Sequence, residues 1–426
     1  MSFGTVGILI AGLLAVVLAL IGFLDVVRGT PVRDVKPFAQ DPLPSVEHAA
    51  FRESMELLSK TSLLDGNSVE IFWNGDQTYS RLWDDLRAAR RSITLQLYYN
   101  KNGRMADMLS EILIDRARAG VSVRFLYDAF GTSFKKEYRQ KLRDAGIKLE
   151  AFRPMTVFAL NKMQHRAHIR VICIDGEIGW TGGFGIDDKW FGNGRSPDQW
   201  RDSNVRFTGP AVDQLQTAFT ACWAESTGEL LVFTPPEHRR PERPIVAGLL
   251  HASPSIGSTE AERFFAYSIC SAKKKLYITN SYFVPDADFR RMIREAAQRG
   301  VDTRILTVSR QTDVKSTWYA GRARYEELLR GGVRVFEYQP VMMHAKTLSV
   351  DGAWGAVGSM NADNRSLSLN EETVLMMCDR AAAQTLEQQF LDDLEFSKEI
   401  DLADFQKRGA WERMKEHVCY AFWRVL

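Results

Sequence analysis

The sequence predicts an α/β protein with two similar lobes, each a mixed sheet flanked by helices, related by a pseudo-dyad and preceded by one transmembrane helix. Three observations predict this fold. Short apolar runs alternate with amphipathic stretches through most of the chain, which is typical of α/β sheets. The segment HIRVICIDGEIGWTGGFG, which begins at His168, returns in altered form as HAKTLSVDGAWGAVGSMN from His344, so the repeat is as large as a domain. An uncharged stretch precedes both copies.

That stretch runs from Phe3 to Leu24 and is long enough to cross a hydrocarbon core of about 30 Å as a helix. A cleaved signal peptide is the alternative, but no Lys or Arg precedes the apolar run and no clear A-x-A site follows it. Positive charges appear only afterwards, at Arg28, Arg33 and Lys36. The positive-inside rule therefore predicts a single-pass protein of the inner (cytoplasmic) membrane with its lobes in the cytoplasm.

The rest of the chain divides by composition. Four prolines and the amphipathic run AAFRESMELLSK indicate a linker and a packing helix before the first lobe. Two series of strands and helices follow, with RARAGVSVRFL in the first matching AAQRGVDTRIL in the second. The predicted divisions are an anchor (1–28), a linker and packing helix (29–64), a first lobe (65–235), a second lobe (245–410) and a C-terminal amphipathic helix (411–426).

The C-terminal helix places several large apolar residues near one face. These are Trp411, Met414, Val418, Phe422 and Trp423. Such a face usually packs on a domain, and beside a membrane anchor it can instead lie in the membrane interface. Both alternatives stay open from the sequence.

Composition excludes several classes of protein. With 426 residues, 45% of them hydrophobic, the chain can bury one large core or two medium ones and is not disordered. The formal charge of +2 gives no basic field for nucleic acid, which argues against a nuclease. The five cysteines form no CxxC pair, so neither a zinc site nor a disulfide framework is indicated, and we expect no metal and no cofactor.

The second copy of the repeat carries the chemistry. His344 and Lys346 stand two apart in a strand-like run, so both side chains are expected on one face of the sheet. Asp351 and Gly352 indicate a hairpin turn, and the return strand ends in Gly358 and Ser359, followed by Asn361. An imidazole beside a cation, faced by small residues with open backbone N–H groups, suits attack on a phosphodiester.

The first copy has His168, Arg170, Asp175, Gly176, Gly182 and Gly183 at the same offsets, but Gly185 stands where the second has Asn361. Asp175 and Asp351 fall in turns, which predicts a structural role for both.

The pattern HxKxxxxDxxxxxxG(G/S)xN resembles that of the phospholipase D superfamily. HRAHIR, WRDSNVRFTGPAV and GSMNADNRSLSLNEE are similar to segments of its bacterial cardiolipin synthase branch. The resemblance covers about residues 65 to 410. It implies a covalent mechanism in which one histidine attacks phosphorus and the other moves a proton. His168 is the expected nucleophile and His344 the acid and base, with the reverse assignment open.

The resemblance implies roles for further residues. Lys346 and Arg170 would neutralise the non-bridging oxygens, and Asp202 and Glu372 would orient the imidazoles. The substrate phosphate would be bound by Asn361, Gly182, Gly183, Gly358 and Ser359. Arg170 departs from the lysine of the pattern and is not a neutral exchange, and Gly185 removes a side-chain donor. These departures predict an asymmetric site that holds phosphate chiefly through the second lobe.

The leading interpretation is a cardiolipin synthase that transfers a phosphatidyl group between two phosphatidylglycerol molecules and releases glycerol. A hydrolytic phospholipase D would use the same residues with water as acceptor, and phosphatidylethanolamine is also open as donor. A catalytically silent lipid-binding homologue is the alternative from another class, motivated by Gly185 and Arg170. The expected partners are phospholipid and membrane, without nucleic acid, and a monomer is possible because one chain holds both half-sites.

Overall fold

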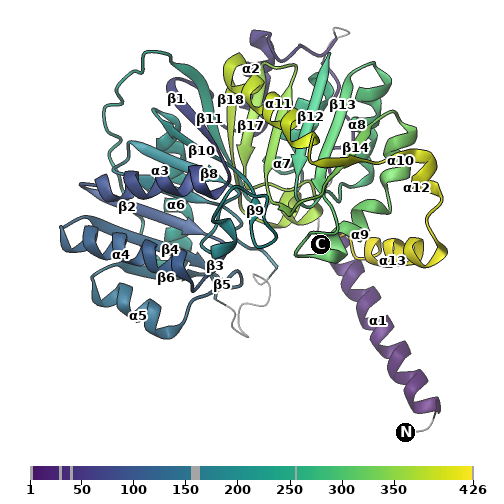
Figure 1. Cartoon of the computed structure of the whole chain (residues 1–426), viewed down its shortest axis with the longest axis horizontal. Coiled ribbons are helices and arrows are strands. Elements are labelled where there is room, and N and C mark those ends of the chain that lie inside the picture. Colours follow the sequence, from purple (N-terminus) through teal and green to yellow (C-terminus); the bar gives the residue numbers. More distant parts are fainter. Residues whose placement is uncertain (1–2, 28–30, 39–41, 155–163, 255–256, 425–426) are drawn as a thin grey trace.

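The computed structural model describes residues 3–27, 31–38, 42–154, 164–254 and 257–424. Within these residues the dominant element is one 15-stranded mixed sheet that runs through both halves of the molecule (Figure 1). Its order is β19-β14-β13-β12-β16-β17-β18-β11-β1-β10-β8-β7-β2-β4-β6. The predicted α/β class is therefore confirmed.

The first half alternates strands and helices as the periodicity predicts. Its strands are β1 (Leu64–Trp73), β2 (Ser92–Leu97), β3 (Asn100–Lys101), β4 (Ser122–Asp128), β5 (Thr132–Ser133), β6 (Lys148–Phe152), β7 (Val171–Ile174), β8 (Ile178–Gly182), β9 (Trp200–Arg201) and β10 (Ser203–Thr208). Its helices are α3 (Asn74–Ala88), α4 (Arg104–Arg118), α5 (Lys136–Asp144), the short η2 (Asp188–Trp190) and α6 (Ala211–Thr227).

The second half repeats this series. Its strands are β11 (Ile245–Ala252), β12 (Lys275–Asn280), β13 (Asp302–Val308), β14 (Arg334–Tyr338), β15 (Met342–Met343), β16 (Lys346–Val350), β17 (Trp354–Gly358), β18 (Glu372–Cys378) and β19 (Ser397–Glu399). Its helices are α7 (Glu260–Ser271), α8 (Ala287–Gln298), α9 (Lys315–Arg322), α10 (Tyr325–Arg330), η3 (Arg365–Leu369), α11 (Arg380–Leu394) and α12 (Leu402–Gln406).

The internal repeat is visible in the strand order. From β1 outward the strands run β10, β8, β7, β2, β4 and β6, and from β11 outward they run β18, β17, β16, β12, β13 and β14. Corresponding neighbours pair with the same polarity, antiparallel near the centre and parallel beyond β2 and β12. The halves join where β1 pairs with β11 in antiparallel fashion. The two lobes therefore share one continuous sheet.

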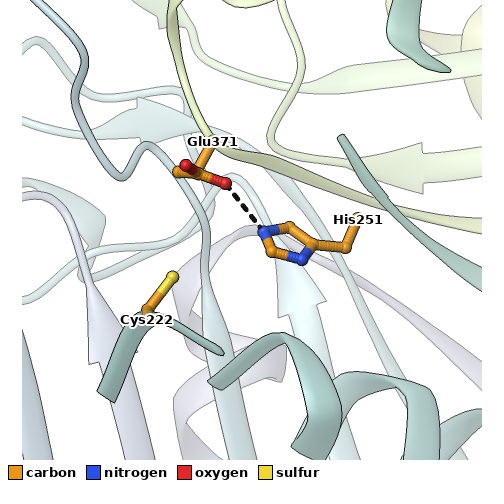
Figure 2. A group of neighbouring side chains, drawn as sticks. All are labelled: Cys222, His251 and Glu371. Carbon is orange, nitrogen blue, oxygen red and sulfur yellow. Dashed lines mark hydrogen bonds and ion pairs between the residues drawn. The ribbon is translucent and has the colours of Figure 1, made fainter. Parts of the chain in front are cut away.

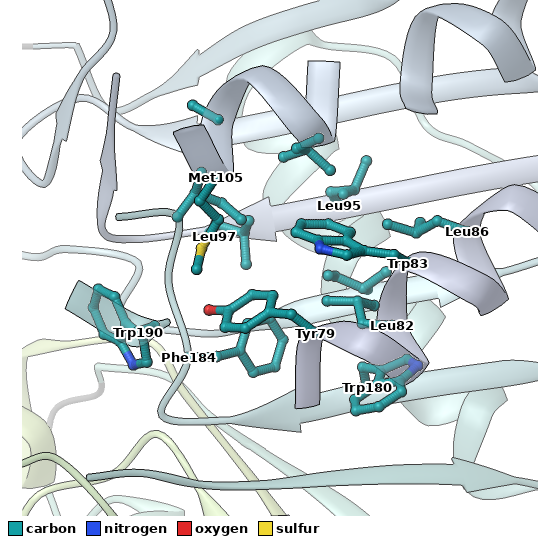
Figure 3. Close-up of a cluster of buried hydrophobic side chains, with 14 of the residues drawn as sticks. Tyr79, Leu82, Trp83, Leu86, Leu95, Leu97, Met105, Trp180, Phe184 and Trp190 are labelled. Carbon is teal, nitrogen blue, oxygen red and sulfur yellow. The ribbon is translucent and has the colours of Figure 1, made fainter. Parts of the chain in front are cut away.

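The core of the first half lies between α3, α4 and the strands. Figure 3 shows Tyr79, Leu82 and Trp83 of α3 packed against Leu95 and Leu97 of β2. All five side chains are buried, and burial of each large apolar side chain contributes about 1.5–3 kcal/mol. Tyr79, Leu82 and Trp83 are spaced so that they share one face of α3, as an amphipathic helix requires.

The N-terminal region contributes two helices. Helix α1 (Phe3–Val27) extends away from the lobes (Figure 1), and α2 (Ala49–Ser59) packs on α7 through Phe51, whose ring stacks on Tyr267 with centroids 4.9 Å apart. A search of the described residues finds no helix with the length and apolarity that crossing a membrane requires. The predicted helix at the N-terminus is therefore present as α1, and its role as a membrane span stays a prediction.

The C-terminal helix α13 (Ala410–Tyr420) packs on α9. Four of the apolar residues predicted for the C-terminal segment are exposed, namely Trp411, Met414 and Val418 of α13 and Phe422 just after it.

Candidate active site

The two histidines of the repeat lie just before strands and not within them. β7 begins at Val171 and β16 at Lys346, so the prediction that His344 and Lys346 share a strand face is wrong. The backbone N–H of His344 instead donates to the carbonyl of Arg201, where β15 meets β9. This places each histidine at the contact between the two halves.

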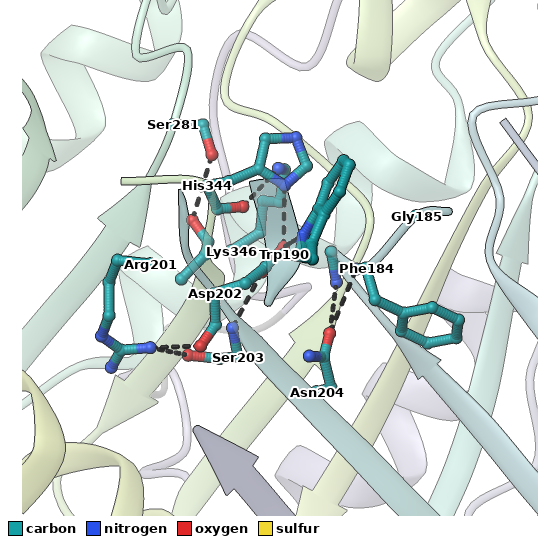
Figure 4. Close-up of polar contacts among 12 residues, drawn as sticks. Phe184, Gly185, Trp190, Arg201, Asp202, Ser203, Asn204, Ser281, His344 and Lys346 are labelled. Carbon is teal, nitrogen blue, oxygen red and sulfur yellow. Dashed lines mark hydrogen bonds and ion pairs between the residues drawn. The ribbon is translucent and has the colours of Figure 1, made fainter. Parts of the chain in front are cut away.

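Each imidazole is hydrogen-bonded to a carboxylate of the opposite half. Nδ1 of His168 lies 2.9 Å from Oε1 and 3.0 Å from Oε2 of Glu372. Nδ1 of His344 lies 2.9 Å from Oδ2 of Asp202 (Figure 4). All four side chains are buried. A bond at Nδ1 fixes the ring and leaves Nε2 for chemistry.

Both histidines line one cavity of about 540 Å³. Of the predicted site residues, His168, Arg170, His344 and Asn361 line it. Asp202 and Glu372 do not, and act on the cavity only through the imidazoles. Side-chain Oδ1 of Asn361 is buried and has no hydrogen-bond partner among the described residues, so it is available to a ligand.

The two cations of the motif are placed differently. Nη1 of Arg170 donates to the carbonyl of His168, and Nε donates to the carbonyl of Phe184 at 3.2 Å. Nζ of Lys346 donates to the carbonyl of His344 (Figure 4). Arg170 lines the cavity and Lys346 does not. Arg365 of the second half also lines the cavity, so both halves present cations to it, and the expectation that the second lobe chiefly holds phosphate stays a prediction.

The small residues after the hairpins make hydrogen bonds to neighbouring strands of the sheet. The N–H of Gly183 donates to Oδ1 of Asn204 at 3.1 Å, and the N–H of Ser359 donates to the carbonyl of Thr373 at 2.9 Å. The prediction that their N–H groups lie open is wrong, because partner strands β10 and β18 occupy them. Gly182 and Gly358 lie at the ends of β8 and β17, and neither they nor Gly183 and Ser359 line the cavity.

The two motif aspartates lie in the hairpin turns, with positive φ of 57° at Asp175 and 53° at Asp351. The carboxylate of Asp351 accepts hydrogen bonds from the backbone N–H groups of Lys273, Lys274 and Lys275. Asp175 does the same for residues 90 to 92. Each aspartate thereby ties its hairpin to the start of the neighbouring antiparallel strand, β2 or β12.

Trp190 explains the departure at Gly185. A Cβ at Gly185 would lie 2.7 Å from the carbonyl oxygen of Tyr99 and 3.0 Å from the Trp190 ring, so no side chain fits. The indole Nε1 of Trp190 donates to Oδ2 of Asp202 at 2.8 Å, and its ring meets His344 edge to face with centroids 5.4 Å apart. In the other half Ser359 makes the equivalent bond, from Oγ to Oε2 of Glu372.

Burial sets the protonation of the site. It lowers the pKa of His344 to about 4, helped by the charge of Lys346 and opposed by Asp202, and it brings the pKa of His168 well below its usual value. Burial raises the pKa of Glu372 to about 8. Burial also opposes ionisation of Asp202, but His344 and Lys346 bring its pKa below the usual value. These shifts favour neutral imidazoles at both histidines and an ionised carboxylate at Asp202.

Comparison with known proteins decides the family. A family model described as "Cardiolipin synthase, PLD-like domain" matches residues 82–223 and 266–394. The chain belongs to the cardiolipin synthase family of phospholipase D-like proteins. Among relatives, cardiolipin synthase of Geobacillus sp. (strain WCH70) is 34% identical over 89% of this chain and 75% of its own. Cardiolipin synthase A of Pseudomonas fluorescens (strain SBW25) is 33% identical over 86% and 77%.

Two solved structures share the fold of this cardiolipin synthase family member. Phosphatidylserine synthase of Haemophilus influenzae superposes with a TM-score of 0.66 at 13% identity, covering 88% of this chain and 100% of that one. Polyphosphate kinase of Porphyromonas gingivalis gives 0.53 at 14% identity, covering 86% and 53%.

One group in the described residues has the composition of a metal site, although no metal was expected from the sequence. The ligand atoms of Cys222, His251 and Glu371 all lie within 4.8 Å of one another (Figure 2). Oε2 of Glu371 already accepts from His251 at 3.0 Å and from Ser253 at 2.6 Å, and Oε1 pairs with Arg153 at 3.2 Å. These bonds saturate the carboxylate, so the group needs no ion to satisfy it.

Sequence reasoning missed several cavity residues of this family member. Trp200 stacks on His344 with centroids 5.1 Å apart, and Arg166 and Asn370 line the wall near His168. Arg166 stands two residues before the motif histidine, a position that an extended segment turns to the same side. That spacing is the signal that would have found it. Trp190, Trp200 and Asn370 give no such signal, because contacts between the halves bring them to the site.

Proposed function

We propose that this protein is a cardiolipin synthase that works by double displacement through a phosphatidyl-histidine. The observation that carries the proposal is the pair of neutral, buried imidazoles that face one cavity, each oriented by a carboxylate from the opposite half. Family membership supplies the substrate class, because the relatives are named cardiolipin synthases.

In the first step Nε2 of His168 attacks the phosphorus of phosphatidylglycerol. A P–N bond forms, the P–O bond to the head-group glycerol breaks, and the glycerol oxygen takes a proton from Nε2 of His344. In the second step the hydroxyl of another phosphatidylglycerol attacks phosphorus and gives its proton back to His344. The P–N bond breaks and cardiolipin is released, so no external acid or base is consumed.

The electrostatics support this assignment of the two histidines. Asp202 is ionised and stabilises a proton on His344, which suits the acid and base. Glu372 has a raised pKa, of about 8, and stabilises an imidazolium less well, which keeps His168 neutral and nucleophilic. An arriving phosphodiester anion offsets the charges of Arg170 and Lys346 and raises the pKa of His344 toward the range of a useful acid.

The polar groups around the cavity have distinct tasks. Arg170 lies on its wall and neutralises the non-bridging oxygens, while the side-chain N–H of Asn361, on the same wall, donates to one of them. Lys346 lies next to His344, and burial lowers its pKa to about 7, so only its protonated form adds positive potential to the site.

A membrane location completes the proposal, with α1 as a single-pass anchor to the cytoplasmic membrane and the lobes in the cytoplasm. The uncharged stretch from Phe3 to Leu24 supports it. So do the exposed side chains of Trp411, Met414 and Val418, which give α13 an apolar stripe suited to the interface.

The test uses the purified full chain in mixed micelles with labelled phosphatidylglycerol, and lipid products are identified by mass. Wild type is expected to yield cardiolipin and glycerol, and His168→Ala and His344→Ala to lose both. His417→Ala, an exposed histidine on α13, is the matched control. Acid quenching should trap lipid label on wild-type protein and none on His168→Ala. Label trapped on His168→Ala and lost from His344→Ala would reverse the assignment. Phosphatidic acid as sole product would indicate a hydrolase.

A further inference from the structure

The two sides of the cavity differ in a way that the catalytic motif does not explain. Beside His344 the pair of residues facing across the halves is Met342 and Trp200, which lie opposite each other in β15 and β9. Beside His168 the bridge between Ala167 and Glu371 is the equivalent of the next pair of that ladder, Met343 and Arg201. One residue earlier in each segment, Arg166 and Asn370 take the places of Met342 and Trp200. An apolar pair thus flanks one histidine and a polar pair flanks the other.

Arg166 is held rigidly. Its Nε and Nη2 make a forked contact with the carboxylate of Asp128 at 3.0–3.2 Å, and Nη2 also donates to the carbonyls of Phe152 and Arg153. The carboxylate of Asp128 is fixed in turn by the N–H groups of Phe130 and Ala167. The guanidinium therefore cannot swing away, and its remaining nitrogen has a set position.

That remaining nitrogen, Nη1 of Arg166, has no hydrogen-bond partner among the described residues, and neither has Oδ1 of Asn370. Both residues are more than nine-tenths buried, at 2% and 6% exposed, and both line the catalytic cavity. An orphaned buried polar atom costs about 1–3 kcal/mol. A phosphate oxygen in this cavity would satisfy the Nη1 donor of Arg166, and a hydroxyl of the same ligand would satisfy the Oδ1 acceptor of Asn370.

We infer that Arg166 and Asn370 form an acceptor subsite, in which Nη1 of Arg166 donates to the phosphate of the acceptor phosphatidylglycerol and Oδ1 of Asn370 accepts from a glycerol hydroxyl of the same head group, while the attacking hydroxyl approaches the phosphorus held on His168. The inference rests on the proposed function and adds how the acceptor is chosen. Arg166, His168 and Arg170 alternate along one extended segment, so neighbours in this series are roughly 7 Å apart. The two phosphates of cardiolipin are joined through one glycerol, so one phosphate can lie on His168 while the other lies beside Arg166.

The subsite explains how a transferase avoids hydrolysis. Water and simple alcohols carry no phosphate with which to make a charge-assisted bond to Nη1 of Arg166, whereas an acceptor that carries its own phosphate is bound and oriented there. Binding at this point places the acceptor hydroxyl near the phosphatidyl-histidine, which raises its effective concentration above that of competing nucleophiles.

The test is a competition between acceptors. Full-length protein in mixed micelles receives phosphatidylglycerol together with ethanol, and the ratio of cardiolipin to phosphatidylethanol is measured by mass. Asn370→Asp places a negative charge against the acceptor phosphate at nearly constant volume, and Arg166→Lys removes the fixed fork. Both are expected to lower the ratio about tenfold or more while phosphatidylethanol is still made. Met342→Leu, at the mirror position of Arg166, is the matched control and keeps the wild-type ratio.

The outcomes separate the two proposals. Cardiolipin from wild type with an unchanged ratio in Asn370→Asp would overturn the subsite and leave the proposed function standing. The absence of both products from wild type would overturn the proposed function and the subsite with it. If Arg166→Lys fails to fold, because Asp128 loses its partner, Asn370→Asp decides alone.

Discussion

Nδ1 of His168 and the carboxylate of Glu372 lie 2.9 Å apart although they belong to different halves of the chain. His344 and Asp202 mirror this relationship at the same distance. Neither half therefore contains a complete histidine–carboxylate pair, and the site exists only where the halves meet.

The two carboxylates are expected to differ in importance. Asp202→Asn removes an ionised partner of His344 and should lower kcat by about 10²-fold or more. Glu372→Gln replaces a group that already favours its protonated form, so the loss should be about tenfold or less. Steady-state turnover of phosphatidylglycerol checks the order, with circular dichroism as the control for folding. Equal losses in the two variants would contradict the assigned charge states.

Glu372 should also make stability depend on pH. Its pKa is about 8 in the folded protein against an ordinary value of 4.5, so between these values the unfolded chain binds fewer protons and stability falls as pH rises. Glu372→Gln removes that term. Its Tm relative to wild type should therefore increase from pH 5 to pH 8 in thermal melts. His344, with a pKa of about 4, works in the opposite direction up to its unfolded value of 6.5 and is present in both proteins.

Restoring the motif at Gly185 is expected to harm the protein. Gly185→Asn forces a side chain against the Tyr99 carbonyl and the Trp190 ring, and overpacking of this kind costs about 1–3 kcal/mol. Displacing Trp190 also breaks its bond to Asp202, so activity should fall. Chemical denaturation and turnover check both effects. Gly409→Asn is the control, because nothing lies within 4 Å of a Cβ there. A gain in activity in Gly185→Asn would refute this account.

The motif aspartates are expected to affect stability and not chemistry. Asp351→Ala leaves three backbone N–H groups of residues 273 to 275 without their acceptor and should cost about 1–2 kcal/mol. Turnover per folded molecule should stay near wild type. A large loss of kcat at unchanged stability would instead place Asp351 in the reaction.

The sequence predicts the fold well where the pattern is local. The apolar spacing of α3, α4 and α8 and the aspartate-glycine turns depend on near neighbours, and the repeat itself implies the same strand order in both halves. The repeat also identifies the two histidines, His168 and His344, as equivalent residues. The prediction that the N–H groups of Gly183 and Ser359 lie open was wrong because it depends on strand register. Only the pairing of β8 with β10 and of β17 with β18 shows that these groups are hydrogen-bonded.

Other features of the site come from contacts between the halves. Nothing in the chain order tells that Asp202 serves His344 and Glu372 serves His168, since each partner is far away in sequence. The role of Trp190 was also not predictable from the sequence. The motif alone suggests that Gly185 lacks a hydrogen-bond donor, whereas in the structure the Trp190 ring occupies the space that a side chain at Gly185 would need.

The pairing of β1 with β11 has a mechanical consequence. The two strands pair at Leu64 with Ala247 and at Asn67 with Ile245, on either side of an irregularity in register, and this hydrogen-bonded junction restricts any hinge motion that would change the spacing of the two imidazoles. Entry of lipid and escape of glycerol must then depend on side chains and loops at the rim of the cavity. The enzyme would operate as a rigid frame, and severing its backbone between the halves should abolish activity unless the pieces reassemble along that one seam.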